Sequence, residues 1–142
     1  MKLLKYDVRL LPLNILGRWH NQLGSVLTIS ELSRDGFLKG GYKSHVGTKG
    51  EYFKVNGVVN YQDLHTSRNR DLVISFMVKW GSYGSVTSWV GYFEEVNGVL
   101  YLKTKWNLVS PPKALDSGLR ILSNTDVFTR NPHPLSRNLL TS

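Results

Sequence analysis

Tryptophans and short neutral polar side chains recur along this chain of 142 residues in an order that suits a pocket for a small molecule. The polar candidates, with a single acid among them, are Asn21, Ser25, Tyr42, Ser44, Ser85, Thr87 and Asp126. Trp80, Trp89 and Trp106 each stand in a segment of strand-like sequence. Aromatic walls and a few convergent hydrogen-bonding groups are the usual components of small-molecule sites. The pattern therefore predicts a site for one specific ligand.

β-Strands are the elements expected to hold these side chains, because apolar and polar residues alternate between turn signals. The expected strands are Val26–Leu32, Phe37–Ser44, Leu72–Trp80, Val86–Phe93, Tyr92–Val96, Val99–Leu108 and Leu119–Arg130, with a weaker one at Val55–Gln62. Asn97-Gly98 is the strongest hairpin signal, since it tolerates the positive φ angles of a type I′ turn. No segment has a convincing helical period, although Lys113–Gly118 could form a short helical turn. Turn signals about every 8–12 residues indicate an all-β barrel or sandwich.

Length and composition are those of one globular domain, with 41% hydrophobic and 11% aromatic residues. The chain has no run of 18 apolar residues, so we expect no membrane-spanning helix. The absence of cysteine excludes disulfides and thiolate chemistry. The net charge of +8 admits acidic partners, but the lysines alternate with apolar neighbours as on an exposed barrel face. We therefore expect neither a nucleic-acid partner nor a membrane partner.

Two pieces of sequence near the ends of the expected barrel resemble calycin barrels, the group that contains lipocalins and avidins. Gly17-x-Trp19 stands near the first strand, and Phe128-Thr129-Arg130 stands in the last. In that group the early tryptophan closes one end of the barrel, and the late arginine stacks over it in a cation–π contact. The resemblance thus implies contact between Trp19 and Arg130.

A finer pattern between residues 17 and 130 is similar to the avidin and streptavidin family of biotin-binding proteins. The segments that keep the family's spacing are Trp19-x-Asn21-x-Leu23-Gly24-Ser25, Gly40-x-Tyr42-x-Ser44, Ser85-x-Thr87-x-Trp89, Leu102-Lys103-Thr104-x-Trp106-x-Leu108 and Asp126-x-Phe128-Thr129-Arg130. The resemblance implies an all-β fold, an eight-stranded antiparallel up-and-down β-barrel. We accordingly divide the chain into an N-terminal extension (residues 1–13), the barrel (residues 14–130) and a C-terminal tail (residues 131–142).

The resemblance also implies non-covalent, high-affinity biotin binding in the open end of the barrel. The biotin-binding residues it implies are Asn21, Leu23, Ser25, Tyr42, Ser44, Val46, Gly47, Thr48, Trp80, Ser85, Thr87, Trp89, Trp106, Leu108 and Asp126. The head of biotin is a cyclic urea, whose oxygen would accept hydrogen bonds from Asn21, Ser25 and Tyr42. Ser44 and Asp126 would accept hydrogen bonds from the two urea N–H groups. An ionised Asp126 would polarise the urea, because charge-assisted hydrogen bonds are about twice as strong as neutral ones.

The remainder of the ligand would meet apolar walls and loops. The residues implied to enclose the bicyclic ring and the aliphatic chain are Trp80, Trp89, Trp106, Leu108 and Val46. The residues implied to meet the valerate carboxylate are Ser85, Val46, Gly47 and Thr48. Thr87 would face the ring sulfur, and Tyr83 could cover the carboxylate end.

The chain departs from this family just before the last strand. Avidin and streptavidin lend each site a tryptophan from a neighbouring subunit, but the corresponding position here is Gly118, and no tryptophan follows Trp106. We therefore expect a lower affinity than in those relatives. The resemblance implies self-association as a homotetramer, with a homodimer as the alternative because Gly118 lacks the aromatic ring. It also implies secretion, although the first residues contain no intact signal peptide.

We expect no enzymatic activity, since the chain has no Gly-x-Ser-x-Gly elbow, no Walker A sequence and no Gly-x-Gly-x-x-Gly motif. Its four histidines show no metal-ligand spacing, so we expect no metal and no cofactor, biotin being a ligand. The main alternative is a lipocalin-like carrier of another small molecule. Lipid carriers need apolar interiors, so this alternative does not explain the polar side chains around Asn21 and Asp126. An OB-like barrel that binds single-stranded nucleic acid is a second alternative, but the resemblance places the tryptophans inside.

Overall fold

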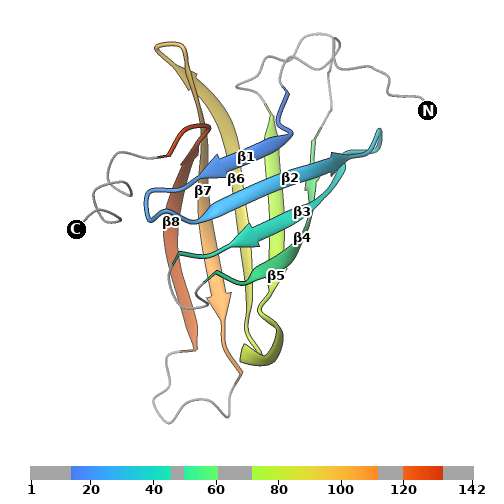
Figure 1. The fold of residues 1–142 in the computed structure, drawn as a ribbon, viewed down its shortest axis with the longest axis vertical. Helices are drawn as coiled ribbons and strands as arrows, with labels where there is room; N and C mark the ends of the chain where they lie inside the picture. Colours follow the sequence, from blue (N-terminus) through green and yellow to red (C-terminus); the bar gives the residue numbers. More distant parts are fainter. Residues whose placement is uncertain (1–13, 46–49, 61–71, 112–119, 133–142) are drawn as a thin grey trace.

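Eight β-strands form a closed barrel in the computed structural model, which describes residues 14–45, 50–60, 72–111 and 120–132 (Figure 1). The strands are β1 (Gly17–His20), β2 (Val26–Leu32), β3 (Phe37–Lys43), β4 (Tyr52–Val59), β5 (Val73–Lys79), β6 (Val86–Val96), β7 (Val99–Val109) and β8 (Ile121–Thr129). Each strand pairs antiparallel with the next, and β8 pairs back to β1. The expected eight-stranded antiparallel up-and-down barrel is confirmed.

The alternation of residue types decides which side chains fill the barrel, because successive side chains of a strand point to opposite faces. In β5, Ile74, Phe76 and Val78 are buried, whereas Val73 and Met77 are exposed. Buried apolar side chains from every strand join those of β5 in one hydrophobic core. The period-two pattern of the sequence thus corresponds to an inner and an outer face.

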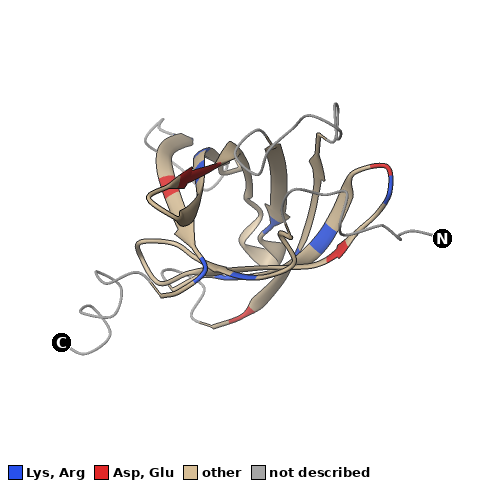
Figure 2. Ribbon diagram, turned by 90° about the horizontal axis from the view of Figure 1, so that it is seen from above, with Lys and Arg blue, Asp and Glu red and all other residues tan. Residues whose placement is uncertain are grey.

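Lysines occupy outward positions on several strands. Lys39 and Lys43 belong to β3, Lys54 to β4 and Lys79 to β5, and all four are exposed. Figure 2 shows the Lys and Arg positions on different strands, with Asp and Glu positions among them. This distribution agrees with the solvated outer face expected from the sequence. In the described ranges, no helix has the length and apolar character needed to cross a membrane.

The hairpin between β6 and β7 turns at Asn97-Gly98. Asn97 has φ 53° and Gly98 has φ 81°, the left-handed angles that a type I′ turn requires. Val96 pairs with Val99 across the turn. The hairpin expected from the Asn-Gly dipeptide is therefore confirmed.

Strand β4 lies earlier in the chain than the alternation predicts. It spans Tyr52–Val59 rather than Val55–Gln62, and both ranges contain Asn56-Gly57. At Gly57 the strands β4 and β5 approach so closely that a Cβ atom would lie 2.3 Å from the carbonyl oxygen of Ser75. Glycine here permits a close approach of two backbones.

Other boundaries differ more modestly. β6 runs unbroken over Val86–Val96, where the sequence predicts two overlapping segments. A short 3₁₀ helix, η3 (Gly81–Tyr83), joins β5 to β6 between the strands expected at Leu72–Trp80 and Val86–Phe93. The helical turn predicted at Lys113–Gly118 lies outside the described residues. The division into extension, barrel and tail stays a prediction, because residues 1–13 and 133–142 also lie outside them.

Trp19 and Arg130 close one end of the barrel. Trp19 is fully buried and donates its indole N–H to the carbonyl oxygen of Ile15 at 3.0 Å. The guanidinium carbon of Arg130 lies 4.1 Å from the centre of the Trp19 ring, and Nη1 donates to the carbonyl oxygen of Leu16 at 2.8 Å. Gly17 has φ 107°, and a Cβ atom there would lie 3.2 Å from Arg130 Nη1, so the backbone conformation and the arginine both favour glycine. The predicted contact between Trp19 and Arg130 is confirmed.

Candidate functional site

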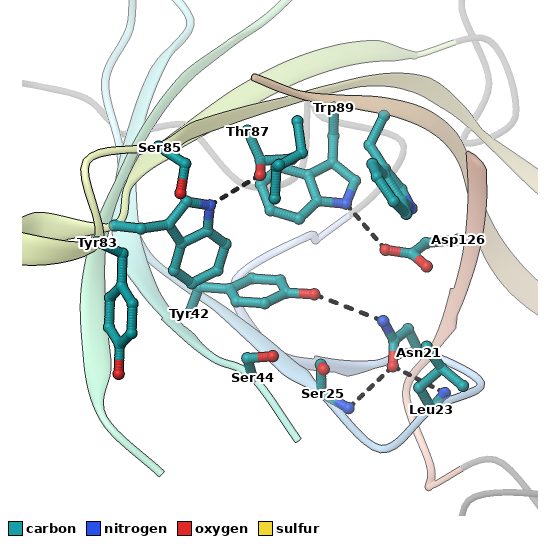
Figure 3. A pocket seen from close by; sticks show the side chains of 13 residues that line it. Asn21, Leu23, Ser25, Tyr42, Ser44, Tyr83, Ser85, Thr87, Trp89 and Asp126 are labelled. Atoms are coloured by element: carbon teal, nitrogen blue, oxygen red, sulfur yellow. Dashed lines mark hydrogen bonds between the residues drawn. The ribbon is translucent and has the colours of Figure 1, made fainter. Parts of the chain in front are cut away.

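The end of the barrel opposite Trp19 contains a cavity of about 350 Å³ (Figure 3). The residues that line it are Asn21, Leu23, Ser25, Tyr42, Ser44, Trp80, Tyr83, Ser85, Thr87, Trp89, Trp106, Leu108 and Asp126. They belong to the β1–β2 loop, to β3 and the residue that follows it, to the β5–β6 connection, and to β6, β7 and β8. An up-and-down barrel brings these segments together because alternate loops lie at the same end.

Every predicted site residue within the described ranges lines this cavity. Val46, Gly47 and Thr48 lie outside the described residues. Tyr83, which the sequence analysis placed near one end of the ligand without including it in the site, is an additional lining residue. It comes from η3, in the connection between the strands expected at Leu72–Trp80 and Val86–Phe93, and is 53% exposed. The contacts of all these residues with a ligand stay a prediction.

The β1–β2 loop holds Asn21 in a defined orientation. Its Oδ1 accepts hydrogen bonds from the backbone N–H of Leu23 at 3.0 Å and of Ser25 at 2.8 Å. Asparagine is favoured at such a position because its side chain can bond to the backbone that follows it. With Oδ1 occupied by the loop, Nδ2 faces the cavity and lies 3.5 Å from the hydroxyl oxygen of Tyr42.

Ser25 and Tyr42 present hydroxyl groups whose oxygens already accept hydrogen bonds. Ser25 Oγ accepts from the backbone N–H of His45 at 2.9 Å, and the Tyr42 oxygen accepts from Asn21. A hydroxyl that accepts in this way can still donate its own hydrogen. Burial first, and the charge of Asp126 second, raise the pKa of Tyr42 above its usual value, while a hydrogen bond with Ser25 partly opposes the rise. The phenol therefore keeps its proton at neutral pH.

Asp126 is the single carboxylate among the lining residues, and it is 4% exposed. Its Oδ2 accepts a hydrogen bond from Trp89 Nε1 at 2.9 Å, and its Oδ1 accepts from Gln22 Nε2 at 3.0 Å. Both donors are neutral, so they orient the carboxylate without neutralising its charge. Gln22 was not a candidate from the sequence, because no motif links it to a residue in the last strand.

Tryptophan side chains form the walls of the cavity (Figure 3). Trp89 is stacked on Phe76, with ring centres 4.8 Å apart and planes inclined by 13°. Trp80 donates its indole N–H to Thr87 Oγ1 at 2.8 Å. Trp106 lies beside Trp89 on the neighbouring strand. The indoles of Trp89 and Trp80 are thus each held by another side chain.

The arrangement suits recognition of a neutral polar head group. Within the described ranges, no group of three or more His, Cys, Asp or Glu side chains could hold a metal ion. Asn21, Ser25 and Tyr42 place three hydrogen-bond donors at one side of the cavity, and Ser44 and Asp126 place acceptor oxygens beside them. A small planar group with one acceptor and adjacent donors matches this set.

Comparison with known protein families decides the relationship. A model described as the avidin family matches residues 10–131. The chain belongs to the avidin family. Among curated relatives, avidin-related protein 6 of Gallus gallus is 30% identical over 94 residues, which is 66% of this chain and 61% of that protein. Avidin-related protein 4/5 of Gallus gallus is 30% identical over 98 residues, or 68% of this chain and 63% of that protein. The chain therefore spans less than two thirds of the length of these avidin relatives.

Solved structures of avidins are similar in fold as well as sequence. Apo shwanavidin is 30% identical, with a TM-score of 0.69, and the comparison covers 84% of this chain and all of that one (100%). Xenavidin is 28% identical, with a TM-score of 0.70 and coverage of 83% and 97%. A biotin-binding protein from chicken is 27% identical, with a TM-score of 0.69 and coverage of 83% and 96%. A variant of shwanavidin in complex with biotin gives a TM-score of 0.65 at 30% identity, with coverage of 84% and 99%.

Proposed function

We propose that this avidin-family protein binds biotin non-covalently in the barrel cavity, with the urea head inside and the carboxylate toward the mouth. The observation that carries the proposal is the meeting of neutral donors and one buried carboxylate in a space walled by tryptophans. The cavity of about 350 Å³ is within the range of roughly 300–1,000 Å³ that small-ligand sites occupy.

The oxygen of the urea is the first point of recognition. Asn21 Nδ2 and the Tyr42 hydroxyl each retain a hydrogen that can be donated to it, and the Ser25 hydroxyl, which bonds with Tyr42, can rotate to donate to it. Their oxygens are occupied by Leu23 N–H, His45 N–H and other protein donors, which aims the hydrogens into the cavity. Fixed donors of this kind stabilise negative charge on an oxygen without a reorganisation cost on binding.

The two urea N–H groups are the second point. Asp126 and Ser44 are buried and offer acceptor oxygens beside the donor group. A charged acceptor on one side and three donors on the other draw electron density toward the urea oxygen, so each set strengthens the other. The neutral donors Trp89 and Gln22 leave the charge of Asp126 available for this purpose.

The apolar part of the ligand would lie against the tryptophans. Trp89 and Trp106 flank the inner part of the cavity and Trp80 the outer part, and Thr87 would face the ring sulfur. Ser85 and Tyr83 stand at the β5–β6 connection, where the carboxylate would emerge. Support also comes from the relatives, one solved as a biotin complex and one described as a biotin-binding protein.

Thermal unfolding with and without biotin tests the proposal. A ligand that binds only the folded chain adds about 2.7 kcal/mol of stability at 100 times its Kd, and the gain grows with concentration. We expect a rise in Tm with biotin that is lost in Asn21→Ala and in Asp126→Ala, and retained in the exposed control Asn56→Ala. No rise at about 1 mM biotin would refute biotin as the ligand and leave the lipocalin-like carrier, tested in the same assay with apolar ligands.

We also propose that the protein self-associates. Large apolar side chains are exposed on the outer faces of β5 to β8, namely Val73, Met77, Val86, Val90, Tyr92, Val109 and Ile121. Apolar patches that span neighbouring strands are typical of protein–protein surfaces. Light scattering should give a mass of two or four chains, and Val90→Lys, at a position 61% exposed, should lower it. A mass of one chain for the unaltered protein would contradict the proposal.

The affinity should be lower than in relatives that receive a tryptophan from a neighbouring subunit, because Gly118 stands at that position. A large aromatic side chain at such a hot spot contributes at least about 2 kcal/mol, which corresponds to about 30-fold in Kd. Competition calorimetry against avidin measures the difference. Equal affinities would show that another group of this chain supplies the missing contact.

A further inference from the structure

The seam between the first and last strands is the shortest join in the barrel. β8 pairs with β7 along its whole length, from Tyr101 opposite Thr129 to Val109 opposite Ile121. On its other side the described pairing with β1 consists of His20 opposite Thr129. The backbone of β8 around Asp126 therefore extends past the end of β1.

The side-chain amide of Gln22 occupies the place that a strand would take there. Its Nε2 donates to the carbonyl oxygen of Thr125 at 3.2 Å, and its Oε1 accepts from the backbone N–H of Val127 at 3.0 Å. A strand residue that pairs in parallel with residue 126 would bond to the same two groups. The primary amide has the same donor and acceptor as a peptide group, so it can replace one.

The same amide also bonds to the site. Nε2 of Gln22 donates to Asp126 Oδ1 at 3.0 Å, while Trp89 holds Oδ2 from the other side. Gln22 lies between Asn21 and Leu23, both of which line the cavity. One side chain therefore ties the loop that carries the urea-oxygen donors to the strand that carries the acceptor carboxylate.

We propose that Gln22 is a positioning residue: its neutral amide closes the barrel seam and aims the carboxylate of Asp126 into the cavity. The inference rests on the proposed function, since the orientation of the carboxylate affects affinity only if the ligand bonds to it. Gln22 itself does not line the cavity, so it acts through Asp126 and not by touching the ligand.

The proposal requires a donor at Nε2. Gln22→Glu keeps an acceptor for Val127 but places a second oxygen against the carbonyl of Thr125 and Asp126 Oδ1. That oxygen can restore the bond only when it carries a proton. The titratable partner of the amide is Asp126, whose charge also acts on Tyr42. Trp89, which bonds to the carboxylate, and Thr104, which bonds to the backbone oxygen of Asp126, are neutral.

The experiment compares biotin affinity of the full-length chain with those of Gln22→Glu and Gln22→Leu from about pH 8 to about pH 4.5. The readout is the ratio of each variant's Kd to that of the unaltered protein at the same pH. Gln22→Glu should bind about tenfold or more weakly at the high end and should recover as pH falls. Gln22→Leu should bind biotin more weakly than the unaltered protein by a similar factor at every pH. Asn56→Asp, an amide-to-acid change on the outer face of β4, should keep a ratio near one.

Ratios near one for both Gln22 variants, or an equal loss for Gln22→Glu at every pH, would overturn the positioning role. Hydrogen exchange of the Val127 amide without ligand separates this outcome from a failure of the proposed function. If the unaltered protein does not bind biotin, faster Val127 exchange in Gln22→Leu than in Asn56→Asp still supports the seam-closing role. Unchanged exchange would overturn that role as well.

Discussion

Replacing Tyr42 by phenylalanine removes one oxygen atom from the cavity and keeps the aromatic ring. The ring lies 4.9 Å from that of Trp89 and 5.9 Å from that of Trp80, so the wall should survive. The hydroxyl accepts from Asn21 Nδ2 at 3.5 Å, which is long for a hydrogen bond. The Ser25 hydroxyl, which also bonds with Tyr42, can rotate to another acceptor. The free protein should therefore lose little stability.

The loss should appear when the ligand is bound. In the proposed complex the phenol donates to the urea oxygen, in a site where Tyr42 is 3% exposed. A neutral hydrogen bond contributes about 0.5–1.5 kcal/mol, and one to a charged group about 1.5–3 kcal/mol. We expect an increase in Kd of about tenfold, which is 1.4 kcal/mol.

Differential scanning fluorimetry at a fixed excess of biotin measures this loss. A tenfold weaker Kd removes about 1.4 kcal/mol of ligand-derived stability, which lowers the biotin-bound Tm by about 3–6 °C. Tyr52→Phe is the matched control, since Tyr52 lies on the outer face of β4 and is 63% exposed. Both variants should match the unaltered protein when biotin is absent.

Two results would refute this reasoning. If Tyr42→Phe and Tyr52→Phe keep the full biotin-dependent rise in Tm, the phenol does not bond to the ligand. If Tyr42→Phe loses several degrees without biotin, the hydroxyl serves the folded barrel and its placement in a ligand site is wrong.

Three further predictions concern stability. Because the pKa of Tyr42 is raised, above about pH 10 the unfolded chain releases a proton that the folded chain keeps. The free energy of unfolding should therefore fall more steeply with pH there than it does in Tyr42→Phe. Equal dependence on pH in the two proteins, measured by urea titration, would count against this prediction. Asn97→Ala, at φ 53°, should cost about 1–2 kcal/mol while Asn97→Gly costs almost nothing, and calorimetry with equal losses for both would contradict this. Arg130→Lys should destabilise the barrel by about 1–2 kcal/mol by weakening the contact with Trp19, whereas the exposed control Arg120→Lys should not; equal melting points would show that the stacked guanidinium is dispensable.

Local features of the fold could be predicted from the sequence. The alternation in β5 and the Asn97-Gly98 turn depend on backbone geometry within a few residues, and both were found where expected. The position of β4 depends instead on the contact between Gly57 and the backbone at Ser75. That contact joins two strands, so the alternation within one segment does not reveal it and gives the strand other bounds.

The same distinction applies to the site. Asn21, Tyr42 and Asp126 could be named because their types and spacing match a known family, and the cavity brings them together. Gln22 could not be named, since its three partners lie 103 to 105 residues further along the chain. Its role follows from where β1 ends, which no motif encodes.

Because Trp19 and Arg130 close one end, the cavity of the described barrel opens only at the other end. A bound ligand would enter head first and withdraw tail first, past Tyr83 at the mouth. A substituent on the ligand's head would collide with the buried core, whereas one on its tail would remain outside. The protein would therefore hold a molecule attached to the tail of its ligand at the mouth of the barrel, while the head of the ligand stays buried.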